Sequence, residues 1–180
     1  VTDRTFSLGY GFNFMNTSLE KLSDILEDQD FKLTMDFVNK ISGDLEQESI
    51  KERFKLLRKK GVYPYEYMDN FNKFNYQLPE SDDAYVNTLE YETDSYHKLT
   101  DKQKANVIKD KLHAKLVYKT FGCENMRQYH DLYLKSDVFL LADIFERFRN
   151  IAIDKFKLDP CHYYTLPSMA FDALLKYTKI

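Results

Sequence analysis

The sequence contains little glycine or proline, few cysteines and no long apolar run. With 5 Gly and 4 Pro in 180 residues, it lacks the composition of collagen-like or low-complexity chains. Its richest apolar run, Val138–Ala142, has an aspartate on either side, and no run reaches the 18 or so apolar residues of a membrane-spanning helix. We therefore expect a globular chain with no membrane segment and no membrane partner.

Cysteine is too scarce for a disulfide framework. Cys123 and Cys161 lie in unrelated contexts, without the Cys-x-x-Cys or Cys/His spacing of a zinc site. This argues against structural zinc and predicts a reducing, intracellular compartment. Valine in place of methionine at position 1, with no apolar signal core after it, suggests a piece of a longer chain.

Apolar residues make up 43% of the chain and aromatic residues 16%, which is enough for a sizeable packed core. The 26 basic and 29 acidic residues nearly balance, but they are unevenly distributed. Positions 51–60 hold six cations and one anion, whereas positions 80–94 hold six carboxylates and no cation. The first stretch could attract phosphate. The second follows Pro79 and indicates an acidic loop or insertion over about residues 78–100.

Hydrophobic periodicity predicts one strand at the start of the chain. Apolar side chains alternate with polar residues and glycine over residues 6–14, which is typical of a strand with one buried face. The capping-box pattern Thr17-x-x-Glu20 then predicts a short helix that begins near Ser18.

Four further helices are predicted. One carries an apolar stripe of Ile50, Phe54 and Leu57 and ends before Gly61. A Thr100-x-x-Gln103 capping box opens another, which ends at Gly122 and has lysines that we expect to be solvated. The longest runs over about 124–156, and the last follows Pro167 after a break at Asp159-Pro160. The expected buried stripe of the Thr100 helix consists of Ala105, Ile108, Leu112 and Leu116.

Tyr133 and Asp137 lie four residues apart within the longest predicted helix. That spacing places a phenol and a carboxylate on one helix face. The carboxylate could bind a hard divalent cation, and the phenol could orient a water bound to that cation. A core tyrosine beside a surface aspartate gives the same spacing, so the pattern alone leaves both interpretations open.

Three strings in order, together with a shorter match near the start of the chain, are more specific. They are FNFMNTSL at 12–19, KKGVYPYEYMD at 59–69, YHDLYLKSD with LLAD at 129–143, and LDPCHYYT at 158–165. These strings resemble protein-primed family B DNA polymerases, above all those of Polinton/Maverick elements and related viruses. The resemblance implies the C-terminal part of a 3′–5′ exonuclease domain over 1–156 and the lead-in to a polymerase domain over 157–180. The implied fold is α+β and predominantly helical, a partial RNase H-like domain with the strand at about 6–14 and the long helix at about 124–156.

The resemblance assigns the helix pair to the third exonuclease motif, Tyr-x-x-x-Asp. It implies that Asp137 binds a catalytic Mg or Mn ion of a two-metal site and that Tyr133 positions the attacking water. The family's other carboxylates, in Asp-x-Glu and Asn-x-x-x-(Phe/Tyr)-Asp motifs, are expected upstream of Val1. The only Asp-x-Glu in the chain, Asp44-Leu-Glu46, lies in a polar stretch and is interpreted as accidental. The isolated chain is therefore expected to be catalytically inactive.

Five further residues match family motifs for DNA contact. Lys60 matches the lysine of a Lys-x-x-hydrophobic motif, implied to act on the scissile phosphate, and Tyr65 matches an aromatic that follows it. Ser18, Leu19 and Leu22 match a Ser/Thr-Leu-x-x-hydrophobic motif implied to contact the single-stranded primer end. Each has an ordinary alternative: a helix C-terminal cation for Lys60, packing around a proline for Tyr65, and the first turn of a capped helix for Ser18 and Leu19.

The function implied by the resemblance is a segment of a DNA-directed DNA polymerase that replicates viral or mobile-element DNA. Its partners would be the single-stranded 3′ end of DNA and a terminal priming protein, in the host nucleus or cytoplasm. The alternative is a catalytically inactive helical module, derived from the same fold, that binds nucleic acid or protein. His130 and His162 lack partners at ligand spacing, so both are predicted to be structural or surface residues.

Overall fold

The computed structural model describes residues 17–179, and these residues are mostly helical. The predominantly helical character predicted from the sequence is therefore confirmed. No strand occurs in this part of the chain, so it does not support an RNase H-like sheet, and the strand predicted over 6–14 lies outside the described residues. The α-helices are α2 (Leu19–Ser23), α3 (Lys32–Ser42), α4 (Gln47–Leu57), α5 (Thr88–Tyr91), α6 (Asp101–Thr120), α7 (Met126–Phe156) and α8 (Leu166–Thr178). Single 3₁₀ turns are η1 (Asp28–Asp30), η2 (Phe71–Asn75), η3 (Asp83–Tyr85), η4 (Tyr96–Lys98) and η5 (Pro160–His162).

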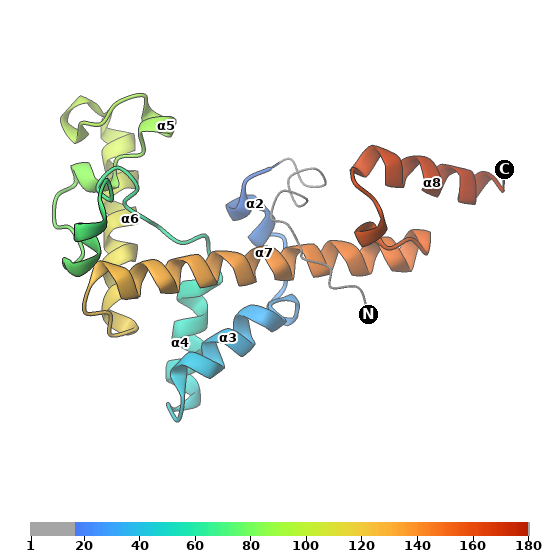
Figure 1. Ribbon diagram of the computed structural model, residues 1–180, viewed down its shortest axis with the longest axis horizontal. Coiled ribbons are helices and arrows are strands. Elements are labelled where there is room, and N and C mark those ends of the chain that lie inside the picture. Colours follow the sequence, from blue (N-terminus) through green and yellow to red (C-terminus); the bar gives the residue numbers. More distant parts are fainter. Residues whose placement is uncertain (1–16, 180) are drawn as a thin grey trace.

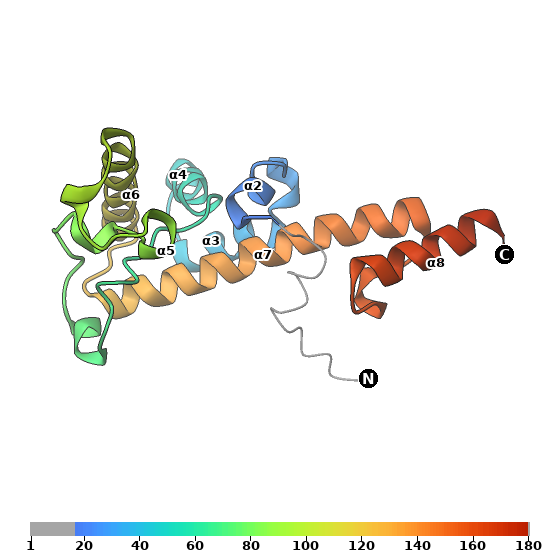
Figure 2. The same ribbon diagram turned by 90° about the horizontal axis from the view of Figure 1, so that it is seen from above.

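The 31-residue helix α7 is the element on which the others assemble (Figure 1). Its start is capped by Asn125, whose side chain accepts a hydrogen bond from the Gln128 amide, and it ends at Lys157 in a left-handed conformation. The helix predicted over about 124–156 is thus confirmed. Helix α6 lies near the N-terminal end of α7 in both views, α3 packs on α7, and α4 packs on α3 (Figures 1 and 2).

One face of α7 forms the centre of the main core. Its buried side chains recur every three or four residues, as expected for a helix with one packed face. They contact apolar side chains of α3 and α4, among them Val38 and Phe54, both of which are almost fully buried. The buried residues of α7 are Met126, Tyr129, Leu132, Ser136, Leu140, Asp143, Ile144, Phe145 and Ala152.

Asp143, the charged residue on this face of α7, caps the N-terminus of α3. The N-cap residue of α3 is Phe31, which has no side chain able to accept a hydrogen bond. The Asp143 carboxylate instead accepts hydrogen bonds from the amides of Leu33 (2.8 Å) and Thr34 (2.9 Å). An anion at the amino end of a helix also interacts favourably with the helix dipole. Asp143 therefore fixes α3 to α7.

Part of the cationic stretch at 51–60 also has a structural use. Arg53 on α4 donates a hydrogen bond to the Thr120 carbonyl at the end of α6 (3.0 Å) and lies near the Ser42 hydroxyl at the end of α3. Arg58 pairs with Asp28 at 2.6 Å. Lys51 pairs with Glu48 at 3.4 Å, so the expectation that this stretch attracts phosphate stays a prediction for Lys55, Lys59 and Lys60.

The apolar stripe predicted for α6 is wrong, although the helix and its capping box are confirmed. Ala105, Ile108, Leu112 and Leu116 are exposed, and the buried residues are Val107, Ala114 and Val117. The reason is the packing partner: α6 packs on α4 and on the acidic loop, and the face that they cover is not the one that the apolar stripe predicted.

The lysines on the packed face of α6 are not merely solvated, as had been expected from the sequence. Lys111 pairs with Asp82 at 2.7 Å, and Lys115 pairs with Glu80. These ion pairs join the acidic loop to α6 and supply the cations that the loop itself lacks.

The C-terminal end forms a second, smaller cluster. Ala152 of α7 packs against Met169 of α8, and Arg149 binds Asp159 through two hydrogen bonds of 3.0 and 2.8 Å. The helix break predicted at Asp159-Pro160 is confirmed, and the domain boundary at 157 stays a prediction. No helix within residues 17–179 combines the length and apolar character needed to cross a membrane.

Candidate functional site

Two segments that are distant in the sequence meet at the middle of the fold. After α4 the chain runs without regular structure along the first half of α7. The Tyr65 and Tyr133 hydroxyl oxygens lie 2.5 Å apart, and the Gly61 amide donates to a carboxylate oxygen of Asp137 at 3.4 Å. The Val62 carbonyl accepts a hydrogen bond from the Tyr129 hydroxyl at 2.5 Å. The structure therefore brings both residues of the Tyr-x-x-x-Asp pair against the segment that contains Lys60 and Tyr65.

Glycine at position 61 permits this approach. A Cβ atom there would lie 2.6 and 2.8 Å from two ring carbons of Tyr133 and 3.7 Å from a carboxylate oxygen of Asp137. Carbon atoms in van der Waals contact are about 3.5–4.0 Å apart, so the ring occupies the space that any side chain would need. The sequence indicated Gly61 only as a helix stop. Its contact with the Tyr133–Asp137 pair could not be predicted, because Gly61 and Asp137 are 76 positions apart in the chain.

Asp137 is a half-buried carboxylate that makes no ion pair with any described residue. Burial raises its pKa, while the Tyr133 hydroxyl, the Gly61 amide and the positive charge of Lys60 act in the opposite direction. Burial, the neighbouring Tyr65 hydroxyl and the Asp137 carboxylate raise the pKa of Tyr133, whose phenol is protonated at neutral pH. The site thus presents an acceptor and a hydroxyl donor side by side, with no cation sealing the carboxylate.

A second aromatic layer supports Tyr133. The ring of Tyr63 stacks on that of Tyr133 with 4.9 Å between centroids, and its hydroxyl lies 2.9 Å from Nδ1 of His130. Burial and the nearby Tyr65 raise the pKa of Tyr63 to about 12. His130 therefore acts as a structural partner, as predicted, while His162 lies exposed in η5.

Lys60 is not a cation of the last helical turn. Helix α4 ends at Leu57 with Arg58 as its C-cap, so Lys60 lies in the segment that follows the helix. Its side chain is exposed and forms no ion pair with residues 17–179. Burial raises the pKa of Asp137 and of Asp110, and the positive charge of Lys60 opposes this rise at both carboxyl groups.

Ser18, Leu19 and Leu22 lie on α2. The Ser18 hydroxyl caps this helix by accepting a hydrogen bond from the Lys21 amide at 3.4 Å. The short helix is thus confirmed, but the predicted capping box of Thr17 and Glu20 is wrong, because the N-cap is Ser18. Leu19 and Leu22 are half-buried against the main core. The ordinary capping alternative thus describes what Ser18 does here, and a DNA contact by these three residues stays a prediction. Glu20 is the α2 residue that reaches the site.

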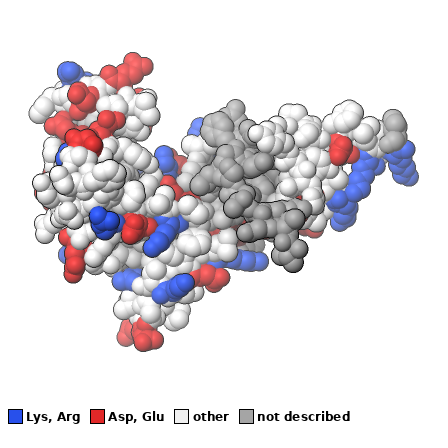
Figure 3. All heavy atoms as spheres, viewed as in Figure 1, with Lys and Arg blue, Asp and Glu red and all other residues white. Residues whose placement is uncertain are grey.

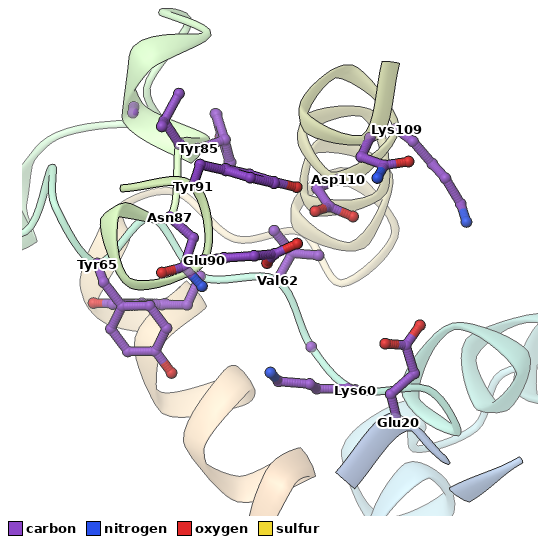
Figure 4. A pocket seen from close by; sticks show the side chains of 15 residues that line it. Glu20, Lys60, Val62, Tyr65, Tyr85, Asn87, Glu90, Tyr91, Lys109 and Asp110 are labelled. Carbon is purple, nitrogen blue, oxygen red and sulfur yellow. The ribbon is translucent and has the colours of Figure 1, made fainter. Parts of the chain in front are cut away.

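A cleft of about 290 Å³ opens beside this site (Figure 4). Lys60, Gly61 and Tyr65 line one side of it, and residues of η3, α5 and α6 line the other. Asp and Glu side chains gather over the loops around α5, at the upper left of Figure 3. The residues on this second side of the cleft belong to no motif found in the sequence, and the acidic stretch at 80–94 was the only sequence feature near them. They include Asn87, Glu90, Tyr91, Asn106 and Asp110.

The donor set limits what the site can do alone. Within residues 17–179 no group of three or more His, Cys, Asp or Glu side chains is placed to hold a metal ion. Asp137 can contribute one ligand, and a two-metal site needs several carboxylates. Comparison with known proteins gives no further guidance, since no family model, curated protein or solved structure matches the chain.

Proposed function

We propose that the chain is a segment of a protein-primed family B DNA polymerase that contributes the third exonuclease motif and single-stranded DNA contacts to 3′–5′ proofreading. It would comprise the C-terminal part of an RNase H-like exonuclease domain and the lead-in to the polymerase domain. One observation carries the proposal. Lys60 and Tyr65 were assigned from one motif and Tyr133 and Asp137 from another, and the fold brings the two motifs together.

Each residue has a defined task in this proposal. Asp137 supplies one carboxylate ligand, and the protonated Tyr133 hydroxyl, held by Tyr65, orients water beside it. Lys60, exposed and not ion-paired with any described residue, stabilises negative charge on the scissile phosphate. The Mg or Mn ions, when bound, supply Lewis acidity and lower the pKa of the attacking water.

The exposed ring of Tyr65 suits single-stranded DNA. Its exposed fraction is 61%, and it lines the same cleft as Lys60. Non-specific binding of single strands combines cations along the phosphate backbone with aromatic rings on which bases stack. The segment 60–65 offers one of each, beside the carboxylate of Asp137.

Binding of single-stranded DNA by the 180-residue chain tests the proposal. A fluorescently labelled oligothymidine is titrated at two salt concentrations with the wild type, with Lys60→Ala/Tyr65→Ala, and with the control Lys155→Ala/Tyr177→Ala. We expect the first variant to bind about tenfold more weakly at low salt and to show a shallower salt dependence. The control replaces an exposed lysine and an exposed tyrosine far from the site and should bind like the wild type. Equal binding by all three proteins would contradict the proposed DNA path.

Nuclease activity gives an independent check. With only one carboxylate of the metal site, the chain should not degrade single-stranded DNA in Mg or Mn. Metal-dependent degradation that Asp137→Asn abolishes would contradict the claim that the chain contains only one carboxylate of the metal site.

A further inference from the structure

Helix α6 carries an apolar stripe on a face that the described fold leaves uncovered. Ala105, Ile108, Leu112 and Leu116 recur at intervals of three and four residues, and all four are exposed, Leu112 by 61%. The buried residues of α6 lie on its other side, where α4 and the acidic loop pack. The helix therefore has one apolar face more than residues 17–179 use.

The shape and position of α6 suit a contact with another helix. It lies at the end of the molecule away from α8 (Figures 1 and 2). Its 20 residues span about 30 Å, so the stripe runs along an extended edge. Apolar side chains at intervals of three and four form the contact seam of paired helices in coiled coils.

The two ends of the stripe carry opposite charges. Asp101 lies one turn before the stripe and Lys119 one turn after it, on the same face. Both side chains are exposed, and neither forms an ion pair with the described residues. Asp101 and Lys119 lie at equal distances in sequence from position 110, as do Ile108 and Leu112. The face is therefore complementary to itself under a two-fold axis at that position.

We propose that the apolar stripe of α6 is a homodimer interface, in which α6 packs antiparallel to α6 of a second copy about a two-fold axis near position 110. Each copy uses the same patch, so the contact closes on itself and forms no open chain of molecules. The inference does not depend on the proposed function. The facing pairs would be Ile108 with Leu112, Ala105 with Leu116, and Asp101 with Lys119.

The size of the contact and its flanking charges predict a weak dimer. A contact about 30 Å long and one helix, about 10 Å, wide falls below the roughly 1,200 Å² of stable interfaces. Lys102 and Lys109 are exposed on one flank, and the two copies of Lys109 would lie near the axis and repel each other. The two Asp101–Lys119 pairs oppose this repulsion. We therefore expect a dissociation constant of about 10–100 μM, at the weak end for specific contacts.

Sedimentation equilibrium of the 180-residue chain, at concentrations from below to above this range, tests the apolar part of the interface. Leu112→Glu should weaken the dimer at least about tenfold, because it places a carboxylate of each copy in the apolar seam. Leu112 is exposed in the single chain, so circular dichroism should not change. Leu134→Glu replaces a leucine of α7 that is 52% exposed, and this control should dimerise like the wild type.

A charge exchange tests the antiparallel arrangement. Asp101→Lys alone places like charges at both ends of the seam, and so does Lys119→Asp alone. Each should weaken the dimer about fivefold, as expected for exposed charges. The double variant restores opposite charges and should recover most of the wild-type affinity. Each substitution also puts its charge at the unfavourable end of the α6 dipole, so a purely structural effect would be largest in the double variant.

The outcomes separate a second copy from other occupants of the stripe. A chain that stays monomeric at every concentration, or a dimer that Leu112→Glu leaves intact, would overturn the inference. A double exchange that fails to restore the dimer would contradict the antiparallel arrangement. Leu112→Glu should leave binding of single-stranded DNA unchanged. If a monomeric chain instead loses DNA binding through this substitution, the stripe contacts DNA and the homodimer is wrong.

Discussion

The ring of Tyr133 lies against the backbone of Gly61, closer than any side chain at position 61 would allow. Gly61→Ala would place a Cβ 2.6 Å from a ring carbon, so the ring or the segment must move. The backbone at Gly61 is not in the left-handed region, so the cost is steric. We expect a loss of about 1–3 kcal/mol in the free energy of unfolding, measured by urea denaturation.

A double-mutant cycle isolates the cause. In a Tyr133→Ala background the ring is gone, and Gly61→Ala should then cost much less than in the wild type. If the cost of Gly61→Ala is the same with and without the ring, the contact does not determine the path of this segment.

Local signals in the sequence predicted α2, α4, α6, α7 and α8, but not α3 or α5. The capping box of Thr100 and Gln103 and the break at Asp159-Pro160 each act within a few residues, and each is present in the structure. The face of α6 could not be predicted in this way. Periodicity identifies apolar residues along a helix, but which face is buried depends on the partner, and here the partner is a loop held by Lys111 and Lys115.

The candidate site was predictable only in its parts. The motifs indicated Lys60, Tyr65, Tyr133 and Asp137, and the fold brings these four together. Gly61 and the cleft residues carry no local pattern, because their positions result from contacts between segments far apart in the chain. Asp143 was noted only within a family string, and its use as the cap of α3 required the structure.

Asp143→Asn should destabilise the fold markedly. The carboxylate accepts two backbone hydrogen bonds at a position that is 1% exposed, and an amide would turn one acceptor into a donor facing an N–H group. Hydrogen bonds to charged groups contribute about 1.5–3 kcal/mol each, so we expect a loss of about 2 kcal/mol in a urea titration. Asp154→Asn, an exposed carboxylate on the same helix, is the control and should change stability by less than about 0.5 kcal/mol. Equal effects of the two substitutions would contradict the capping role.

The ion pair between Arg149 and Asp159 predicts a specific acid sensitivity of the C-terminal cluster. The Arg149 guanidinium lowers the pKa of Asp159 from 3.8 to about 2. A carboxyl group whose pKa is lower in the folded state adds stability above its unfolded pKa, and this contribution disappears as the pH falls through the folded value. The pair should therefore stabilise the fold fully above about pH 5, progressively less between pH 4 and 2, and not at all below that range.

Arg149→Gln tests this window by urea denaturation at pH 7, 4 and 2.5. Because Arg149 is 35% exposed, we expect a loss of only about 1 kcal/mol at pH 7. The difference between variant and wild type should shrink as the pH falls, since protonation of Asp159 removes the same interaction in the wild type. Lys155→Gln removes an exposed cation of the same helix that forms no ion pair with the described residues, and it should show no such convergence. A difference between Arg149→Gln and wild type that is independent of pH would instead assign the role of Arg149 to packing of its side chain against the loop before α8.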